Sequence, residues 1–451
     1  MSSLHDVKLS VLRKIMPPKE EEKRVNDFVR EAVRIVKTVS GIDCAVCGST
    51  GKFTWLKGDH DIDVFMLFSR TVSREELEKK GLEFGRQIAK ELKGKAMIKY
   101  AEHPYTRVYA NGFEIDIVPC YRIKNGEPII SAVDRSPLHL QYILENLDPS
   151  MRDEVRLLKQ FCKGIDVYGS DTKTLGFSGY ICELLAIKYG KLEDVLDSAA
   201  KWTVPVLISL DGNTRAFREP LVIVDPTDTN RNAAANVSAE NLAKFIAKAK
   251  SFVKKPEKNY FFPPEQKPLS KQEIRQLRER KTKFIAITMK RPDVIDDTLY
   301  PQLRRALKRM EGLFGHNEFA LMRGYEYADE KSMALAFELE VWELPAVKKM
   351  VGPPVFVKKH SEEFVAKYPS AHIEGMNWAA DKEREFRTAT ELLKPFMKKK
   401  AAEMETMGIP DNIAKEFTKG KILEDTAFWN FVKKNKDFSA FLRKKYFERL
   451  F

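Results

Sequence analysis

The sequence predicts a multidomain α+β protein whose N-terminal part is built on a small mixed sheet. Its 451 residues exceed what one ordinary core holds, so we expect about three domains or more. Helical repeats and strands of alternating pattern succeed one another over the first 120 residues. Four prolines between residues 254 and 271 exclude a continuous helix or a central strand there, which indicates a boundary.

The first elements follow from local patterns. Acidic residues after Pro18 and apolar residues at helical spacing predict a helix from Lys19 to about Val36. Ser73 and Glu76 form a capping-box pattern that opens a helix to about Leu92. Strands are expected at 61–68, 96–100, 106–109 and 113–119. From 138 to about 254 the pattern is helical.

A Gly-Ser turn followed by an Asp-x-Asp strand is the motif that carries chemistry. Gly48 lets the backbone approach a phosphate, and the Ser49 hydroxyl can donate to it. Asp61 and Asp63 stand at i and i+2, so a strand places both on one face. Such carboxylates repel unless a cation lies between them, and Mg²⁺ takes oxygen ligands that it shares with substrate phosphates. An isolated Asp-x-Asp pair also fits a solvated strand face.

A third carboxylate on a second strand strengthens the metal prediction. Residues 113–119 alternate, with Glu114 and Asp116 on one face and apolar side chains on the other. If this strand lies beside the first, Asp116 joins Asp61 and Asp63 around two Mg²⁺ ions, roughly 3.5–4 Å apart, that clamp the oxygens of an in-line phosphoryl displacement. Taken alone, Asp116 fits a solvated strand residue equally well.

The charge balance suits a polyanionic partner. Lys and Arg number 78 against 65 Asp and Glu, a net charge of +13, and neutralising phosphates releases counterions. No long apolar span and no signal-like N-terminus are present, so we expect a cytoplasmic protein without a membrane segment. Cys44 and Cys47 form a C-x-x-C, but no second pair completes a tetrahedral zinc site, which favours buried thiols.

Longer blocks of sequence resemble the archaeal, class I CCA-adding enzymes, which are tRNA nucleotidyltransferases of the polymerase-beta superfamily. The Asp-x-Asp core alone indicates only the superfamily, whereas the blocks that follow it indicate the CCA family. The similarity covers roughly the first two-thirds of the chain well. The matching blocks are GST, WLKG and DIDVF within residues 48–65, YAEHPY from 100, EIDIVPCY from 114, SAVDRSPLH from 131, EVRLLK from 154, GFSGYICELL from 176, VDPTDTNRNAAANVS from 224 and DDTLYPQL from 296.

The resemblance implies an activity and its partners. The enzyme would add C, C and A to the 3′ end of tRNA from CTP and ATP, without a nucleic-acid template, and would release pyrophosphate at each step. Archaeal relatives are often dimers, so a homodimer is also open. Two alternatives remain at this point: a poly(A) or oligoadenylate polymerase built on the same head, and a tRNA-binding protein with a silent head.

The resemblance also implies roles for single residues. In the family, the residues matching Lys159 and Tyr168 contact the triphosphate of the incoming nucleotide, and the one matching Arg231 meets its base. Lys52 stands where some relatives carry arginine, so the charge is kept and the bidentate contact is lost. Each of these residues alone also fits an ordinary structural position. The implied nucleotide-binding set is Gly48, Ser49, Lys52, His103, His139, Lys159, Tyr168 and Arg231, and the catalytic, metal-binding set is Asp61, Asp63 and Asp116.

The C-terminal part is expected to fold as an α+β body with a tail. The patterns predict strands at 283–289, 318–323 and 332–342 around a helix at 300–314, then helices at 361–368 and 378–404. Arg304, Arg305 and Lys308 are candidates for RNA binding on the first of these helices. We therefore expect a polymerase-beta-like nucleotidyltransferase head at 1–140, a helical neck at 141–256 that completes the nucleotide site, and a tRNA-binding body and tail at 257–451.

Overall fold

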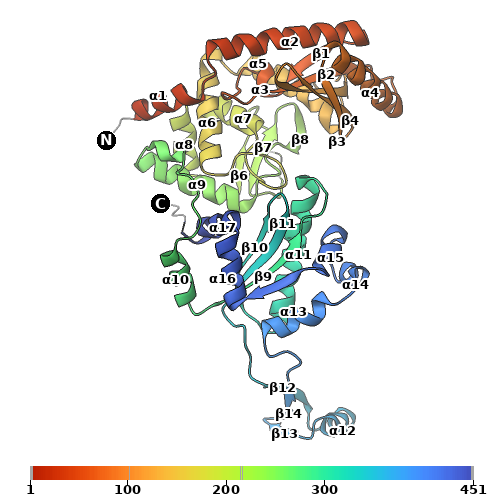
Figure 1. The fold of residues 1–451 in the computed structure, drawn as a ribbon, viewed down its shortest axis with the longest axis vertical. Helices are drawn as coiled ribbons and strands as arrows, with labels where there is room; N and C mark the ends of the chain where they lie inside the picture. Colours follow the sequence, from red (N-terminus) through yellow and green to blue (C-terminus); the bar gives the residue numbers. More distant parts are fainter. Residues whose placement is uncertain (1–3, 101, 214, 216, 448–451) are drawn as a thin grey trace. The chain divides into compact units, whose positions relative to one another are not determined.

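The computed structural model describes residues 4–100, 102–213, 215 and 217–447, which form two units. The first unit extends to Pro264 and the second begins at Glu265, within the proline-bearing segment. Figure 1 shows the elements of both units in chain order. The part of the chain that the structure describes contains no helix long and apolar enough to cross a membrane.

The first unit begins with two helices. In α1 (Leu4–Ile15), Val7, Val11 and Ile15 are buried at four-residue spacing, and the helix packs beside α6 (Arg152–Gly164). Sequence analysis did not predict α1, although Leu4, Val7, Val11, Leu12 and Ile15 recur at helical spacing. The predicted helix after Pro18 is present as α2 (Lys19–Ser40), with acidic residues in its first turn.

A five-stranded sheet forms the centre of the head. Its strand order is β1-β2-β5-β4-β3, and only β2 and β5 run parallel. Helix α4 (Arg74–Glu91) is capped by Ser73, whose side chain accepts from the backbone N–H of Glu76 as predicted, and packs on β3, β4 and β5. The strands are β1 (Cys44–Cys47), β2 (Asp61–Phe68), β3 (Lys95–Tyr100), β4 (Pro104–Ala110) and β5 (Phe113–Tyr121), with the one-turn α3 (Gly48–Gly51) between β1 and β2.

The rest of the first unit is not purely helical, which corrects the sequence prediction. A small sheet of order β6-β7-β8 lies among its helices, formed by β6 (Val206–Ile208), β7 (Leu221–Asp225) and β8 (Asp228–Asn232). Strand β7 is a short apolar run buried at every position, and such a run has no period that separates strand from helix. The helices are α5 (Arg135–Asn146), α6, α7 (Gly179–Tyr189), α8 (Leu192–Ala199) and α9 (Ala239–Lys254), with single turns η1 (Ala132–Asp134), η2 (Pro149–Met151) and η3 (Lys258–Tyr260).

The second unit contains the predicted β-α-β-β order. The sheet order is β10-β11-β9-β15, and all pairs are antiparallel. Alternate residues of β11 (Ser332–Leu339) enter different cores: Leu335 and Phe337 face one, Ala334 and Ala336 the other. Around it lie β9 (Lys283–Lys290), α11 (Asp296–His316), β10 (Leu321–Ala328) and the unpredicted β15 (Lys421–Glu424), with α10 (Lys271–Glu279), α13 (Ala389–Met397), α14 (Ala401–Thr406), α15 (Asp411–Phe417), α16 (Asp425–Lys434) and α17 (Lys436–Phe447).

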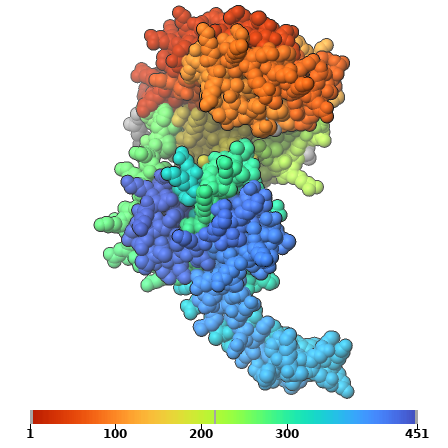
Figure 2. Space-filling view, turned by 45° about the vertical axis from the view of Figure 1, so that its right-hand side comes forward, coloured from red at the N-terminus to blue at the C-terminus, as the bar shows by residue number. Residues whose placement is uncertain are grey.

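The predictions at 318–323 and 378–404 need correction. The former strand is shifted to β10, and the latter helix is replaced by β14 (Asn377–Glu383), α13 and α14. Strand β14 pairs with β12 (Val347–Pro354) and β13 (His372–Glu374), and α12 (Lys358–Lys367) packs on this small sheet. Pairing therefore overrides the helix propensity of its Ala, Lys and Glu. In Figure 2 these residues, coloured pale blue, project from the rest of their own unit.

Candidate active site

Two parallel strands place the three predicted aspartates at neighbouring positions of one sheet. Asp63 of β2 lies directly opposite Asp116 of β5, and Asp61 lies opposite Glu114. All four side chains stand on one face of the sheet, because residues two apart on a strand share a face. The expectation that the second strand pairs beside the first is therefore confirmed.

The turn before β2 fits closely against Asp63. Gly48 has φ +64°, and a Cβ added to it would collide with Asp63 Oδ2. Ser49 lies in the single turn α3, where its carbonyl accepts from Thr54 N–H at 3.0 Å. The Thr50 hydroxyl donates to the carbonyl of Asp61 at 2.8 Å. These bonds fix the Gly-Ser turn onto the start of β2.

The carboxylates carry negative charge that the fold compensates only in part. Burial, followed by the charges of Asp116 and Asp61, raises the pKa of Asp63 to about 6. The pKa of Asp61 is also raised, again chiefly by burial. A cation between these groups would offset both the burial of the carboxylates and their mutual repulsion.

Arg107 is a site residue that sequence analysis missed. It lies opposite Asp116 on β4, and its guanidinium donates to both Asp116 oxygens, Nε to Oδ1 at 2.7 Å and Nη2 to Oδ2 at 2.8 Å. Its third nitrogen forms an ion pair with Glu114. Over the described residues, no three His, Cys, Asp or Glu side chains group closely enough to hold a metal ion. Asp116 is thus engaged by Arg107 rather than grouped with Asp61 and Asp63.

A buried charge network joins the turn after α3 to the helices behind it. Glu183 of α7 is fully buried and accepts from Lys52 at 2.8 Å, Thr54 at 2.7 Å and Lys159 at 3.1 Å. Lys159 of α6 also donates to the Thr54 hydroxyl at 2.9 Å and to the Thr54 carbonyl at 3.3 Å. Its three N–H donors therefore all have acceptors. Sequence analysis missed Glu183, although the residue lies within the block GFSGYICELL.

The start of α7 brings Lys159 and Tyr168 together. A Cβ added to Gly179 would lie 3.2 Å from the Tyr168 hydroxyl and 3.3 Å from Lys159 Nζ, so both groups approach the first turn of this helix. The Ser178 hydroxyl caps the helix by accepting from Ile181 N–H at 3.2 Å. Burial raises the pKa of Tyr168, which keeps its hydroxyl protonated and able to donate.

A second buried cluster forms around Asp225 at the end of β7. Its carboxylate contacts His139 Nε2 at 2.9 Å and accepts from Arg231 at 2.7 Å and the Tyr180 hydroxyl at 3.1 Å. The His139 ring stacks on Tyr180 with centroids 3.9 Å apart. Burial lowers the pKa of His139. Burial opposes ionisation of Asp225, but its bond to His139 and the neighbouring charges outweigh that effect and lower its pKa.

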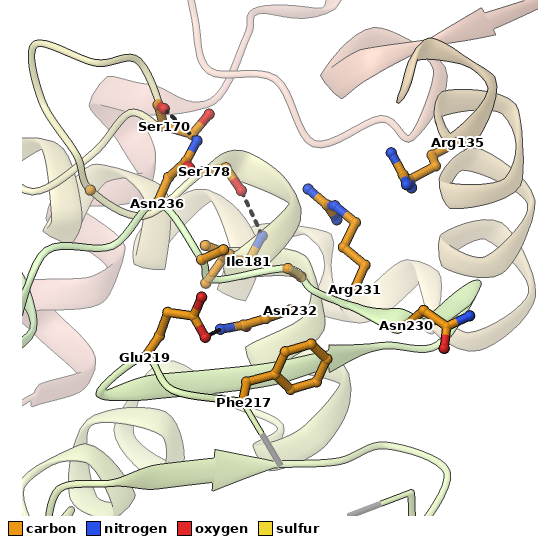
Figure 3. A pocket seen from close by; sticks show the side chains of 13 residues that line it. Arg135, Ser170, Ser178, Ile181, Phe217, Glu219, Asn230, Arg231, Asn232 and Asn236 are labelled. Carbon is orange, nitrogen blue, oxygen red and sulfur yellow. Dashed lines mark hydrogen bonds between the residues drawn. The ribbon is translucent and has the colours of Figure 1, made fainter. Parts of the chain in front are cut away.

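A pocket of about 430 Å³ opens beside this cluster. Figure 3 shows that its walls come from α5, α7 and β8, with Arg135 and Arg231 as neighbouring cations and the Phe217 ring on another wall. Arg135 donates to Asp228 at 2.9 Å, which holds it toward β8. Asn230, Asn232 and Asn236 add amide groups to the lining. A polar pocket with cations and one aromatic ring suits a nucleotide base or sugar.

His103 has a different environment. It is buried just before β4, and its Nδ1 lies 3.1 Å from Glu78 of α4. Its Nε2 has no hydrogen-bond partner among the described residues. The structure therefore places His103 against α4, where it contacts Glu78 and, within the part of the chain that the structure describes, none of the other predicted nucleotide-binding residues.

Three family models match successive parts of the chain. They are described as a nucleotidyltransferase domain (residues 25–139), the second domain of tRNA nucleotidyltransferase (153–262) and the C-terminal domain of the CCA-adding enzyme (280–425). The CCA-adding enzyme of Methanosarcina acetivorans is 37% identical over 97% of this chain and 98% of its own. That of Methanocaldococcus jannaschii is 36% identical over 94% and 96%.

This chain belongs to the CCA-adding enzyme family. Its activity is that of a CCA tRNA nucleotidyltransferase, as the sequence resemblance implied. The α+β, multidomain fold class with a polymerase-beta-like head is likewise confirmed. A relative from Methanothermobacter thermautotrophicus, 38% identical over 86% of this chain and 88% of its own, is also a CCA-adding enzyme.

The predicted RNA-binding residues lie on α11 of the second unit. Arg305 and Lys308 are exposed, whereas Arg304 is half-buried and pairs with Glu326 of β10 at 3.3 Å. The aromatic residues near the C-terminal lysines are core or partly core residues: Phe396 and Phe438 are buried, and Phe441 packs against the same core as Phe438. RNA contact is therefore better sought among the exposed cations than among these rings.

Proposed function

We propose that this enzyme adds C, C and A to the tRNA 3′ end from CTP and ATP, with Asp61, Asp63 and Asp116 holding two Mg²⁺ ions. The observation that carries the proposal is the placement of Asp63 opposite Asp116 on adjacent parallel strands, with Asp61 on the same face. The donor set fits the metal, since carboxylate oxygens are hard ligands. Burial and the neighbouring carboxylates raise the pKa of Asp63, and a bound cation would offset both effects.

The chain's own residues would position the reactants around these carboxylates. When bound, Mg²⁺ would lower the pKa of the attacking 3′-hydroxyl and neutralise charge on the phosphates. Asp61 and Asp63 would hold the ions, and Asp116 would complete the ligand shell of the second ion, the one nearest the hydroxyl, and help to deprotonate that hydroxyl. Gly48 lets the backbone of the turn approach the Asp63 carboxylate closely, and the Ser49 hydroxyl can donate to a phosphate bound at this turn.

Lys52, Lys159 and Tyr168 would provide the triphosphate site. Two lysines share one buried glutamate, so the network carries one excess positive charge that an anion can balance. All three Lys159 donors have acceptors, so Lys159 acts through its charge unless the network rearranges. The Tyr168 hydroxyl adds a directional donor near the first turn of α7, where backbone N–H groups favour anions.

Arg231 would meet the incoming base, with His139 beside it. Asp225 holds both side chains, and the pocket of Figure 3 opens next to them. The Arg231 guanidinium has further N–H donors beyond the one bonded to Asp225, and these can reach base acceptors. His103 remains a predicted nucleotide-binding residue whose support is its unsatisfied buried Nε2.

We assign the remaining roles by part of the chain. Residues 1–140 would carry the catalytic head, 141–256 the neck that completes the nucleotide site, and 257–451 the tRNA-binding body and tail with Arg304, Arg305 and Lys308. The cytoplasm is the proposed location, since the substrates are tRNA, CTP and ATP. A homodimer stays a prediction that sedimentation analysis would test.

The metal assignment is tested by single Asp→Asn variants at 61, 63 and 116. Each should lose C addition to a tRNA that lacks CCA by at least about a thousandfold, because two-metal phosphoryl transfer depends on these ligands. tRNA affinity, measured by filter binding, should stay within about threefold. An Asp43→Asn variant, which alters an exposed ion pair with Lys37 and Arg122, should keep activity. Full activity in any of the three variants would contradict the assignment.

A further inference from the structure

The Asp116 carboxylate stands on β5, between two strands whose charged groups would pull it in opposite directions. On one side is β2 with Asp63, and on the other is β4 with Arg107. A metal ion held by Asp63 and Asp116 together would draw the Asp116 carboxylate toward β2. The guanidinium draws it toward β4, where the structure places it.

Arg107 holds the Asp116 carboxylate firmly on the β4 side. Two parallel N–H donors engage the two oxygens of Asp116, which is the strongest arrangement available to an arginine and a carboxylate. The remaining nitrogen pairs with Glu114, two residues earlier on the same strand. The side chains of Arg107 and Asp116 are only 26% and 14% exposed, so solvent screens the contact incompletely.

We propose that Arg107 is an internal counter-ion that competes with the divalent cation for Asp116. This inference rests on the proposed function, because it takes Asp116 as a metal ligand. In the metal-free enzyme Arg107 offsets the repulsion among the carboxylates of Asp61, Asp63, Glu114 and Asp116. It is thus a positioning residue that lowers divalent-ion affinity until the nucleotide brings further ligands.

The competition has a consequence for metal affinity that can be measured without catalysis. An opposite unit charge within about 4–6 Å stabilises the charged form of a carboxylate by the equivalent of one to three pKa units. That stabilisation corresponds to tenfold or more in an equilibrium constant. Removing the Arg107 charge should therefore tighten binding of Mn²⁺, a spectroscopic substitute for Mg²⁺, by about tenfold. Wild-type protein should also need more Mg²⁺ than the variant for half-maximal C addition.

The test is Mn²⁺ binding to the full chain without nucleotide, followed by the electron paramagnetic resonance signal of the free ion. Arg107→Gln should bind about tenfold more tightly than wild type. Arg107→Lys, which keeps the charge but not the fork, should fall between them and serves if the first variant does not fold. Arg122→Gln, which loses an exposed pair with Asp43 elsewhere in the head, should match wild type.

A double variant locates the effect at Asp116. In an Asp116→Asn background, Arg107→Gln should no longer change Mn²⁺ affinity, because the shared carboxylate is gone. Unchanged or weaker Mn²⁺ binding in both Arg107 variants would overturn the proposal while leaving the metal site intact. Absence of Mn²⁺ binding in every protein, including wild type, would instead overturn the metal assignment itself.

Discussion

Glu183 shows how a single buried residue connects two parts of the nucleotide site. Burial opposes its ionisation, but the charges of Lys52 and Lys159 and their hydrogen bonds outweigh that effect and lower its pKa to about 2. The carboxylate is therefore charged at neutral pH. It fixes both ammonium groups, one from the turn after α3 and one from α6, so their positions are set before a nucleotide binds.

Replacing Glu183 with Gln should destabilise the first unit by about 3 kcal/mol, because removing one partner of a buried ion pair leaves uncompensated charge. Urea unfolding followed by tryptophan fluorescence would measure the change. Glu154→Gln is the matched control, since Lys8 keeps Glu193 as a partner and the expected loss is below about 1 kcal/mol. Equal losses in the two variants would contradict the special position of Glu183.

The lowered pKa of Glu183 also predicts a pH dependence. A carboxyl group whose pKa is lower in the folded state adds stability above its unfolded value, here 4.5, and loses it as the pH falls toward the folded value of about 2. The difference in unfolding free energy between wild type and Glu183→Gln should be constant above pH 5 and shrink between pH 4.5 and 2. A difference that grows on acidification would have the wrong sign.

Single site residues could be predicted from the sequence where a local pattern identifies them. Asp61, Asp63 and Asp116 follow from two-residue alternation, and β2 and β5 bring them to one face. Arg107 and Glu183 carry no such local sign, because their partners are set by strand order and by the meeting of distant segments. Lys52 and Glu183, for example, are 131 residues apart. The ordinary expectation for each alone is a solvated side chain.

The β1-α3-β2 segment depends on Gly48 for the close fit of its turn against Asp63. Gly48 adopts a positive φ and leaves no room for a Cβ next to Asp63. Gly58 in the same loop also has a positive φ, but an added Cβ would meet open space. A substitution at either glycine therefore has the same kind of backbone cost, but only a substitution at Gly48 also displaces the Asp63 carboxylate.

Gly48→Ala should lower kcat for C addition by about a hundredfold, because displacing a site group by about 1 Å can have that effect. Gly58→Ala shares the backbone cost of roughly 1 kcal/mol without the collision, so its kcat should remain within about threefold of wild type. Steady-state kinetics of C addition to a tRNA that lacks its 3′ CCA would compare them. Equal rates in the two variants would show that the Gly48 contact is unimportant.

Elements with a strong local period were predicted well and the others were not. The capped helix α4 and the alternating strand β11 have one consistent signal each. The strands β6 to β8 are short, and β14 has a helix-favouring composition, so pairing with distant strands decides their structure. Prolines at 353 and 354 fit the end of β12 because β12 is an edge strand.

For the whole molecule, the family relation extends over nearly the full chain. The two compact units meet in sequence at Pro264 and Glu265, and the matched models cover the head, the second domain and the C-terminal domain. The sequence suggested a boundary there because prolines interrupt any regular element. A silent, tRNA-binding chain has no need of three aligned carboxylates, so the geometry of the head favours an active enzyme.

The most direct measurement is incubation of the purified full chain with Mg²⁺ and a tRNA that lacks its 3′ CCA. With CTP alone, addition should stop after two C residues, and a single A should follow when ATP is also supplied. The Asp63→Asn variant is the matched negative control. A long A tail would identify a poly(A) polymerase, and tRNA binding without any addition would contradict the catalytic role of Asp61, Asp63 and Asp116.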